Sequence, residues 1–284
     1  QSVFPAVFEI AKENNNLILG FLKKLFQSTT KEDKGKKRKR EIISFPEGLS
    51  TLVRAIHKFL PVNKVKLNSP VKKLFLHNSL LVVELADGQC INAKKVILAV
   101  PAFKAAEIAP EIYKDLSKLR YASVSCVNLI CDEKYFSEDN LKTISSSFGF
   151  LTARDQDIQV LGVIFSSALF SNRCSKGQIA FTCFVGGINN PQALNLSDKE
   201  ITDLCLRDIK KVFHLDSLQQ EFSLVTKWQQ GIPQYEVGHK ALIEAVEPSM
   251  QGIVLAGNYL RGVSVEDSVK SGFEAYKEVN LRKE

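Results

Sequence analysis

Hydrophobic and polar residues follow two different periods along this chain, and the change of period separates its parts. Between 45 and 60 the apolar residues recur at helical spacing, which predicts a turn and then an amphipathic helix with Ser50 as its N-cap. From 64 to 101 the period is that of strands. Turn signals at 78–79 and 87–88 divide this stretch, so we expect a short meander.

Two continuous apolar runs, VILAVP at 96–101 and GIVLAG at 252–257, have the pattern of strands buried on both faces. Such runs are typical of parallel sheets. Between them lie amphipathic strand candidates and a helix at 196–215, which Ser197 and Glu200 begin as a capping box. The sequence therefore predicts an α/β (α+β overall) protein in which a module of sheet and helices interrupts another domain.

The composition, with 45% hydrophobic and 24% charged residues in 284, is that of a globular protein. The net charge is +7, and KEDKGKKRKR at 31–40 carries much of the excess. This run predicts a solvated loop, with an anionic membrane surface, a nucleic acid or a nuclear signal as alternatives. No recognition-helix pattern and no interleaved aromatic residues accompany it, which argues against nucleic acid.

The six cysteines form no CxxC, and without a signal peptide they predict reduced thiols in a cytoplasmic protein. No apolar run reaches the roughly 18 residues that span a bilayer. The four histidines show no metal-ligand spacing, and neither GxSxG nor a P-loop occurs. We therefore expect no metal site and no hydrolase-type catalytic group.

The stretch LAGNYLRGVSVEDSVKSG at 255–272 predicts a strand, a glycine turn and a helix start. Gly257 would let the backbone approach a ligand closely, and Ser264 with Asp267 forms an S-x-x-D capping box. The positive end of the helix would suit the negative charge that a flavin ring gathers on reduction. The alternative is a well-capped loop with a structural role only.

Two further stretches have a structural and a functional interpretation. Trp228, in WQQGIPQYEVGH, is either a core tryptophan or an aromatic plate beside a flat cofactor. Phe184, in FTCFVGG, is by its strand pattern a core residue. No GxG occurs anywhere in the chain, so one end of a dinucleotide site is indicated without the other.

Together, FPEGLSTL, VILAVP, LGVIFSS, FTCFVGG, IPQYEVGH and LAGNYLRGVSVEDSVKSG resemble the oxygen-dependent protoporphyrinogen/coproporphyrinogen oxidases of the flavin amine oxidase superfamily. The resemblance implies FAD-dependent oxidation of protoporphyrinogen IX to protoporphyrin IX in haem biosynthesis, with oxygen reduced to hydrogen peroxide. The protein would bind and orient the ring, and the cofactor would supply the chemistry. Open alternatives are oxidation of coproporphyrinogen III to coproporphyrin III, another flavin amine oxidase-like reaction, and an inactive fragment that only binds porphyrin or protein.

The resemblance also implies the domains. A partial two-dinucleotide-binding FAD domain would occupy 41–103 and 251–284, and a substrate-binding domain of mixed sheet and helices would occupy 104–250. Residues 1–40 would be a helical remnant of the membrane-associated region followed by the basic loop. The family's GxGxxG and its propionate-facing arginine would lie upstream of Gln1.

Matching the family's motifs position by position implies two sets of binding residues and no catalytic side chain. The FAD contacts would be Val71, Trp228, Gly257, Asn258, Val263, Ser264 and Val265. The apolar contacts with the tetrapyrrole would be Leu151, Ile164 and Phe184. Expected partners are the porphyrinogen, oxygen, the missing amino-terminal segment of the same enzyme, a peripheral contact on the inner face of the membrane and a second copy in a homodimer, but no nucleic acid.

Overall fold

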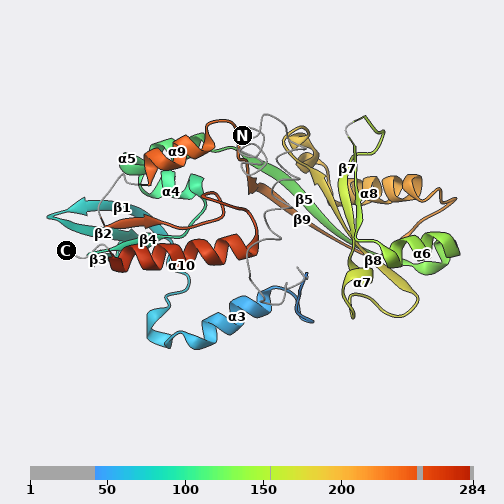
Figure 1. Ribbon diagram of the computed structural model, residues 1–284, viewed down its shortest axis with the longest axis horizontal. Helices are drawn as coiled ribbons and strands as arrows, with labels where there is room; N and C mark the ends of the chain where they lie inside the picture. The colour runs from blue at the N-terminus through green and yellow to red at the C-terminus, as the bar shows by residue number, and fades with distance from the viewer. Residues whose placement is uncertain (1–41, 154, 248–251, 282–284) are drawn as a thin grey trace, which may run out of the picture. The chain divides into compact units, whose positions relative to one another are not determined.

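The computed structural model describes residues 42–153, 155–247 and 252–281, which divide into two compact units (Figure 1). The described residues of unit 1 are 42–43, 63–120, 234–247 and 252–281, and those of unit 2 are 44–62, 121–153 and 155–233. Unit 2 thus interrupts unit 1 in sequence. The predicted domain limits lie elsewhere, at 103 and 250, and the domain functions stay predictions. The expected amino-terminal helices and basic loop fall outside the described residues.

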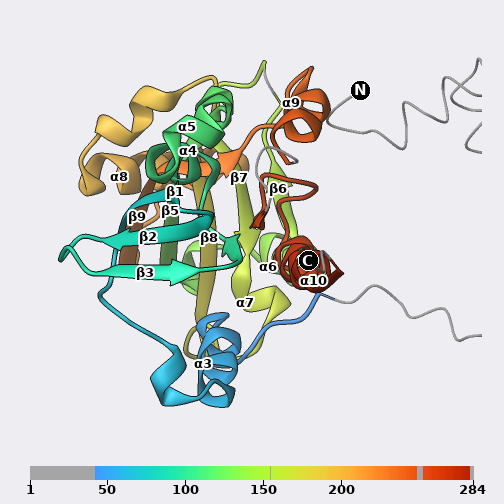
Figure 2. The same ribbon diagram turned by 90° about the vertical axis from the view of Figure 1, so that its left-hand side faces the viewer.

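Unit 1 contains a three-stranded antiparallel sheet of β1 (Val71–His77), β2 (Leu80–Leu85) and β3 (Cys90–Ala93), seen side by side in Figure 2. The first turn has Asn78 and Ser79 at φ 47° and 63°, and the second has Gly88 at φ 84°. Asparagine and glycine tolerate this left-handed region best. The predicted meander and both of its turns are confirmed.

A second sheet of unit 1 pairs β4 (Val96–Leu98) with β10 (Ile253–Leu255) in parallel, as the two apolar runs predict. All of β10 is buried, but Ile97 in β4 is 41% exposed, so burial on both faces holds only for β10. The helix α10 (Val265–Leu281) packs its Ala275 against Val254 and Ala256. The turn between β10 and α10 is thereby held at the carboxyl end of a buried strand.

The remaining helices of unit 1 lie between β4 and β10 in sequence. They are α4 (Ala102–Ile108), α5 (Pro110–Tyr113), the 3₁₀ turn η2 (Lys114–Lys118) and α9 (His239–Val246). Tyr113 and Leu116 are fully buried among them. The 3₁₀ turn η1 (Val62–Lys64) lies at the boundary of the two units in sequence.

Unit 2 is built on one five-stranded antiparallel sheet with the strand order β6-β7-β8-β5-β9. The strands are β5 (Tyr121–Asp132), β6 (Gly149–Leu151), β7 (Val160–Phe165), β8 (Gln178–Gly186) and β9 (Gln220–Pro233). The helices of this unit are α3 (Ser50–Phe59), α6 (Glu138–Ser146), α7 (Ser166–Leu169) and α8 (Asp198–Val212), with 3₁₀ turns η3 (Glu133–Tyr135) and η4 (Pro191–Asn195).

One face of this sheet forms the core of unit 2. Val127, Phe181 and Val163 from three strands pack with Ile201 and Ile209 of α8 in one buried cluster. The predicted capping box begins α8, because the Ser197 hydroxyl accepts the Glu200 N–H at 3.2 Å and the Glu200 carboxylate accepts the Ser197 N–H at 2.7 Å. This helix covers one face of the sheet and leaves the opposite face outside the core cluster.

Asp208 of α8 connects that helix to the start of β7. Its side chain is fully buried, and Oδ2 accepts the backbone N–H groups of Gln159 at 2.6 Å and Val160 at 2.9 Å. Oδ1 accepts the Nε–H and Nη2–H groups of the exposed Arg207 guanidinium. A buried carboxylate with four donors is a fully satisfied polar anchor.

The expected amphipathic helix is confirmed as α3, but its predicted cap is wrong. The N-cap is Leu49, in helical conformation at φ −64°, and Ser50 is the first helical residue. The chain enters the helix through a tight turn in which the Gly48 carbonyl accepts the Thr51 N–H at 3.1 Å. The Ser50 hydroxyl instead accepts from Arg54 at 2.9 Å.

The six cysteines are all free, as predicted, and Cys131, Cys183 and Cys205 are buried. Desolvation raises the pKa of Cys131 to about 12, and a hydrogen bond with Cys205, followed by burial, raises the pKa of Cys183. Such thiols are inert. Over the described ranges, no helix has the length and apolar character that a bilayer crossing requires.

Candidate functional site

The face of the five-stranded sheet opposite the core is the main candidate binding surface, and we call it the open face. Its side chains come from Leu151, Ile164, Cys126, Asn128, Thr182, Phe184, Phe222, Leu224, Thr226 and Trp228. Successive residues of a strand point to opposite faces of the sheet, and residues between those of the open face lie in the core cluster. No ionisable carboxylate, amine or imidazole is in this set.

The three residues predicted to contact the tetrapyrrole all lie on the open face, in adjacent strands. Leu151 pairs with Gly162, which pairs with Phe184, and Ile164 lies two residues further along β7, on the same face. Neighbouring strands lie about 4.8 Å apart, so Leu151 and Phe184 are about 10 Å apart with only a glycine between them. Leu151 is 90% exposed. The result is a shallow apolar shelf.

Phe184 and Trp228 are not core residues. Phe184 is half-buried and outside the core cluster, although its strand pattern predicts a core position. Trp228 is 57% exposed and pairs with Val124, two residues along β5 from Cys126, the partner of Phe184. The core interpretation of both residues is therefore wrong. The proposed contact of Trp228 with FAD stays a prediction.

In unit 1, the stretch after β10 forms a glycine turn with unusual backbone geometry, here called the flavin turn (257–265) after the cofactor that the resemblance implies. Gly257 has φ 152°, and its N–H donates to Ser271 Oγ of α10 at 2.9 Å. The Tyr235 hydroxyl donates to the Asn258 carbonyl at 2.6 Å. His239 lies 4.1 Å from the Tyr235 ring, and burial lowers the pKa of His239.

The predicted capping box at the start of α10 is confirmed. The Ser264 hydroxyl donates to the Asp267 carboxylate at 2.6 Å and accepts the Asp267 N–H at 3.0 Å. The hydroxyl and the backbone N–H of Ser264 both donate to the Asp267 carboxylate and thereby lower the pKa of Asp267. Val263 and Val265 on either side are exposed. By helix geometry, the Val265 and Glu266 N–H groups, which precede the one that Ser264 caps, have no partner within the helix, so they could hydrogen-bond an acceptor.

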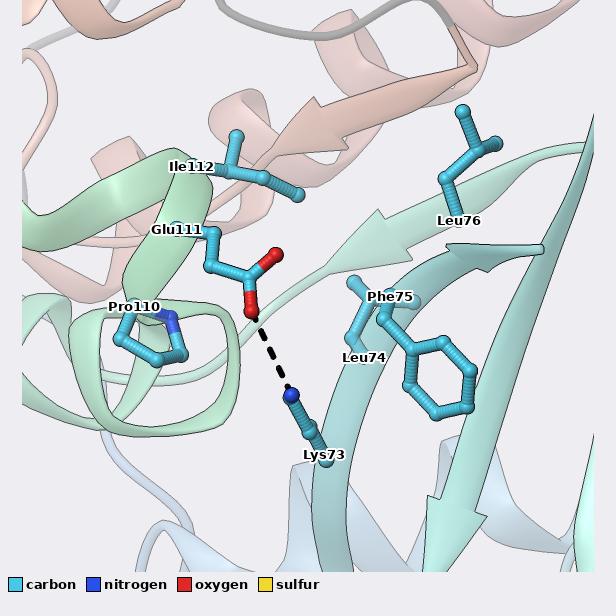
Figure 3. A pocket seen from close by; sticks show the side chains of 7 residues that line it. All are labelled: Lys73, Leu74, Phe75, Leu76, Pro110, Glu111 and Ile112. Carbon is cyan, nitrogen blue, oxygen red and sulfur yellow. Dashed lines mark hydrogen bonds and ion pairs between the residues drawn. The ribbon is translucent and has the colours of Figure 1, made fainter.

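The last predicted FAD contact, Val71, begins β1 and is 37% exposed. Close to it lies a cavity of about 280 Å³ lined by β1 and α5, but Val71 is not part of its lining. Figure 3 shows Lys73 and Glu111 meeting across this cavity, with Nζ 3.4 Å from Oε1. Because its cation already has a carboxylate partner, we assign no ligand to this cavity.

A larger cavity of about 480 Å³ lies on the open face in unit 2. Ile164, Leu224 and Phe222 form apolar walls, while Asn128 and Arg173 add polar groups. Sequence reasoning missed Arg173, which belongs to no motif. Its only sequence signal is a basic residue between two strand candidates.

Comparison with known proteins identifies a family and named relatives. The sequence model described as flavin containing amine oxidoreductase matches residues 2–280, nearly all of the chain.

The chain belongs to the flavin containing amine oxidoreductase family. It is 28% identical to coproporphyrinogen III oxidase of Bacillus subtilis over 277 residues, covering 95% of this chain and 57% of that protein. It is 30% identical to chloroplastic protoporphyrinogen oxidase 1 of Arabidopsis thaliana over 302 residues, covering 99% and 56%. The chain thus spans somewhat more than half the length of these relatives.

Solved structures share the fold. A structure from Exiguobacterium sp. 255-15, provisionally named a protoporphyrinogen oxidase, has a TM-score of 0.79 at 20% identity, over 99% of this chain and 58% of that chain. Cyclohexylamine oxidase of Brevibacterium oxydans has a TM-score of 0.64 at 15% identity, over 83% and 53%. The predicted fold class is confirmed: a mixed helix and sheet protein with the flavin amine oxidase fold.

The family description names a flavin, and the predicted cofactor is FAD. The flavin turn fits the ring end of such a group. Gly257 has a backbone conformation that side chains rarely adopt, and the start of α10 offers N–H donors between exposed valines. No GxGxxG is present in the sequence to hold the pyrophosphate. The described residues therefore fit the ring end of the cofactor, and their contact with it stays a prediction.

Proposed function

We propose that this chain is the porphyrinogen-binding and flavin-ring part of an FAD-dependent oxidase that converts protoporphyrinogen IX to protoporphyrin IX in haem biosynthesis. The observation that carries the proposal is the apolar shelf: Leu151, Ile164 and Phe184 come from three adjacent strands and share the open face. When bound, FAD would supply hydride acceptance and the reaction with oxygen. The chain's own residues would hold the ring and exclude water from it.

The substrate and the partners are part of the same proposal. Coproporphyrinogen III is the second candidate substrate, because the Bacillus subtilis relative carries the name of that oxidation. The proposed partner is the GxGxxG-bearing segment of the family, whether it is continuous with this chain or separate. A cytoplasmic location, a peripheral membrane contact and a homodimer remain predictions.

The surface of α10 supports the need for such a segment. Its residues Val265, Val269, Phe273 and Tyr276 form an apolar stripe along one side of the helix and are all exposed, Phe273 at 64%. Burying a side chain of this size contributes about 1.5–3 kcal/mol. An exposed stripe of four such residues on one helix suggests a surface that another protein segment covers.

The activity test is aerobic turnover of protoporphyrinogen IX by the chain co-expressed with the GxGxxG-bearing segment. Porphyrin fluorescence and hydrogen peroxide should rise above the autoxidation of the substrate. Phe184→Glu should lower kcat/KM at least about tenfold, because the charge must lose water when the ring binds. Phe148→Glu is the matched control, since Phe148 is exposed but not on the open face, and should retain activity.

If the protein oxidises coproporphyrinogen III but not protoporphyrinogen IX, then coproporphyrinogen III is its substrate. Turnover of amines with none of porphyrinogens would place the chain with the family's amine oxidases. Porphyrin binding without any oxidation would leave a binding module.

A further inference from the structure

The cavity on the open face contains a cation that the proposed apolar shelf does not explain. Arg173 is half-buried in the middle of the loop between α7 and β8, and its Cζ lies 5.3 Å from the centroid of the Phe170 ring. Asn172 before it has φ 62°, a conformation that is uncommon for a residue other than glycine. The loop thus holds the guanidinium at a fixed edge of the cavity.

The hydrogen bonds of Arg173 leave part of its guanidinium uncommitted. Nη2 donates to Ser44 Oγ at 2.9 Å and to the Phe45 carbonyl at 3.1 Å. Within the described ranges, Nη1 and Nε donate no hydrogen bond, and no Asp or Glu forms an ion pair with this side chain. A half-buried guanidinium without a carboxylate presents two donors to whatever enters the cavity.

The floor of the cavity also presents donors. The Thr182 hydroxyl donates to Asn128 Oδ1 at 3.0 Å, and the Ser166 hydroxyl completes the chain at 2.8 Å from Thr182 Oγ1. This arrangement occupies the acceptor of Asn128. Its Nδ2 group has no hydrogen-bond partner among the residues that the structure describes. Arg173 and Asn128 therefore both offer N–H groups, which suits a negatively charged acceptor.

The apolar walls of the cavity indicate which kind of molecule carries the negatively charged acceptor. Ile164 belongs both to the cavity lining and to the apolar shelf, and it pairs directly with Thr182, which pairs with Asn128. A ligand that lies over the shelf can therefore extend an acidic side chain into the cavity. Free phosphate or another small, strongly hydrated anion would gain nothing from Ile164, Phe222 and Leu224.

We propose that this cavity binds a carboxylate of the porphyrinogen, a propionate side chain, through Arg173 and Asn128 while the macrocycle lies on the apolar shelf. This inference rests on the proposed function and adds the residues that recognise the acidic side chain. Arg173 orients the ring on the sheet and takes no part in the redox step.

The test is fluorescence titration of the 284-residue chain with coproporphyrin III and, separately, with coproporphyrin III tetramethyl ester. Arg173→Gln removes the cation but can still donate to Phe45. Asn128→Asp keeps the acceptor for Thr182 and places a negative charge in the cavity, independently of Arg173. Lys176→Met is the matched control, because it removes a charge from the same loop at an exposed position.

Both cavity variants should weaken binding of the free acid about tenfold or more and leave ester binding within about twofold. Lys176→Met should leave the affinity for the free acid and for the ester unchanged. If both cavity variants lose as much affinity for the ester as for the free acid, or if neither loses affinity, Arg173 does not bind the carboxylate. Either result would leave porphyrin binding by the chain intact. Failure of the unaltered chain to bind either porphyrin would reject the proposed substrate class and this inference together.

Discussion

Replacing Asp208 by alanine is expected to destabilise unit 2 by at least about 3 kcal/mol. The buried carboxylate accepts the backbone N–H groups of Gln159 and Val160 at the start of β7. Alanine would leave both donors without a partner in a dry environment, at about 1–3 kcal/mol each, and would add a cavity. The ion pair with Arg207 contributes less, because that guanidinium is exposed.

Urea unfolding measures this loss, with fluorescence of Trp228 as the probe. Trp228 is the only tryptophan of the chain and lies in unit 2, so its signal reports the sheet directly. Asp157→Ala is the control, because Asp157 is 94% exposed and pairs only with Lys211 at the surface. That variant should unfold at the same urea concentration as the original protein. If Asp208→Ala also unfolds at an unchanged urea concentration, water must replace the carboxylate as the acceptor for the two N–H groups.

Replacing Gly257 by alanine is expected to destabilise the flavin turn and to lower FAD retention strongly. At φ 152° an alanine is strained, which costs about 1–3 kcal/mol. Its Cβ would lie 2.8 Å from Cε1 and 3.0 Å from Cδ1 of Tyr259. Because that ring is fully buried, it has little room to move, and overpacking adds about 1–3 kcal/mol.

The measurement is the FAD content of the protein purified with its GxGxxG-bearing segment, together with its thermal unfolding. Gly272→Ala is the matched control. Gly272 lies in α10, and a Cβ there would meet no described atom within 4 Å, so alanine should stabilise the helix by about 0.5–1 kcal/mol. Full FAD content in Gly257→Ala would show that the turn does not touch the cofactor.

Local patterns predicted the parts of this fold that depend on nearby residues. The capping boxes at Ser197 and Ser264 and the turn at 78–79 are contacts within four positions, so the sequence contains all of their determinants. The pairing of β4 with β10 joins distant segments, but continuous apolar runs are a strong signal for buried parallel strands.

The open face could not be predicted in the same way. The strand FTCFVGG has apolar or small residues on both sides, so alternation does not say whether Phe181 or Phe184 faces the core. That choice depends on α8, which packs on the Phe181 side from a later part of the chain. Arg173 is similar: the groups that hold it, Ser44 and Phe45, lie about 130 positions earlier in the sequence.

If the proposed function is right, electrons pass from a porphyrinogen to a flavin that this chain and the GxGxxG-bearing segment hold together. The direct measurement is the visible absorption of the FAD-loaded protein mixed with protoporphyrinogen IX in the absence of oxygen. We expect the flavin band to bleach as porphyrin fluorescence appears, and oxygen to restore the band and yield hydrogen peroxide. An unchanged flavin band in the presence of both protoporphyrinogen IX and coproporphyrinogen III would contradict the proposed function.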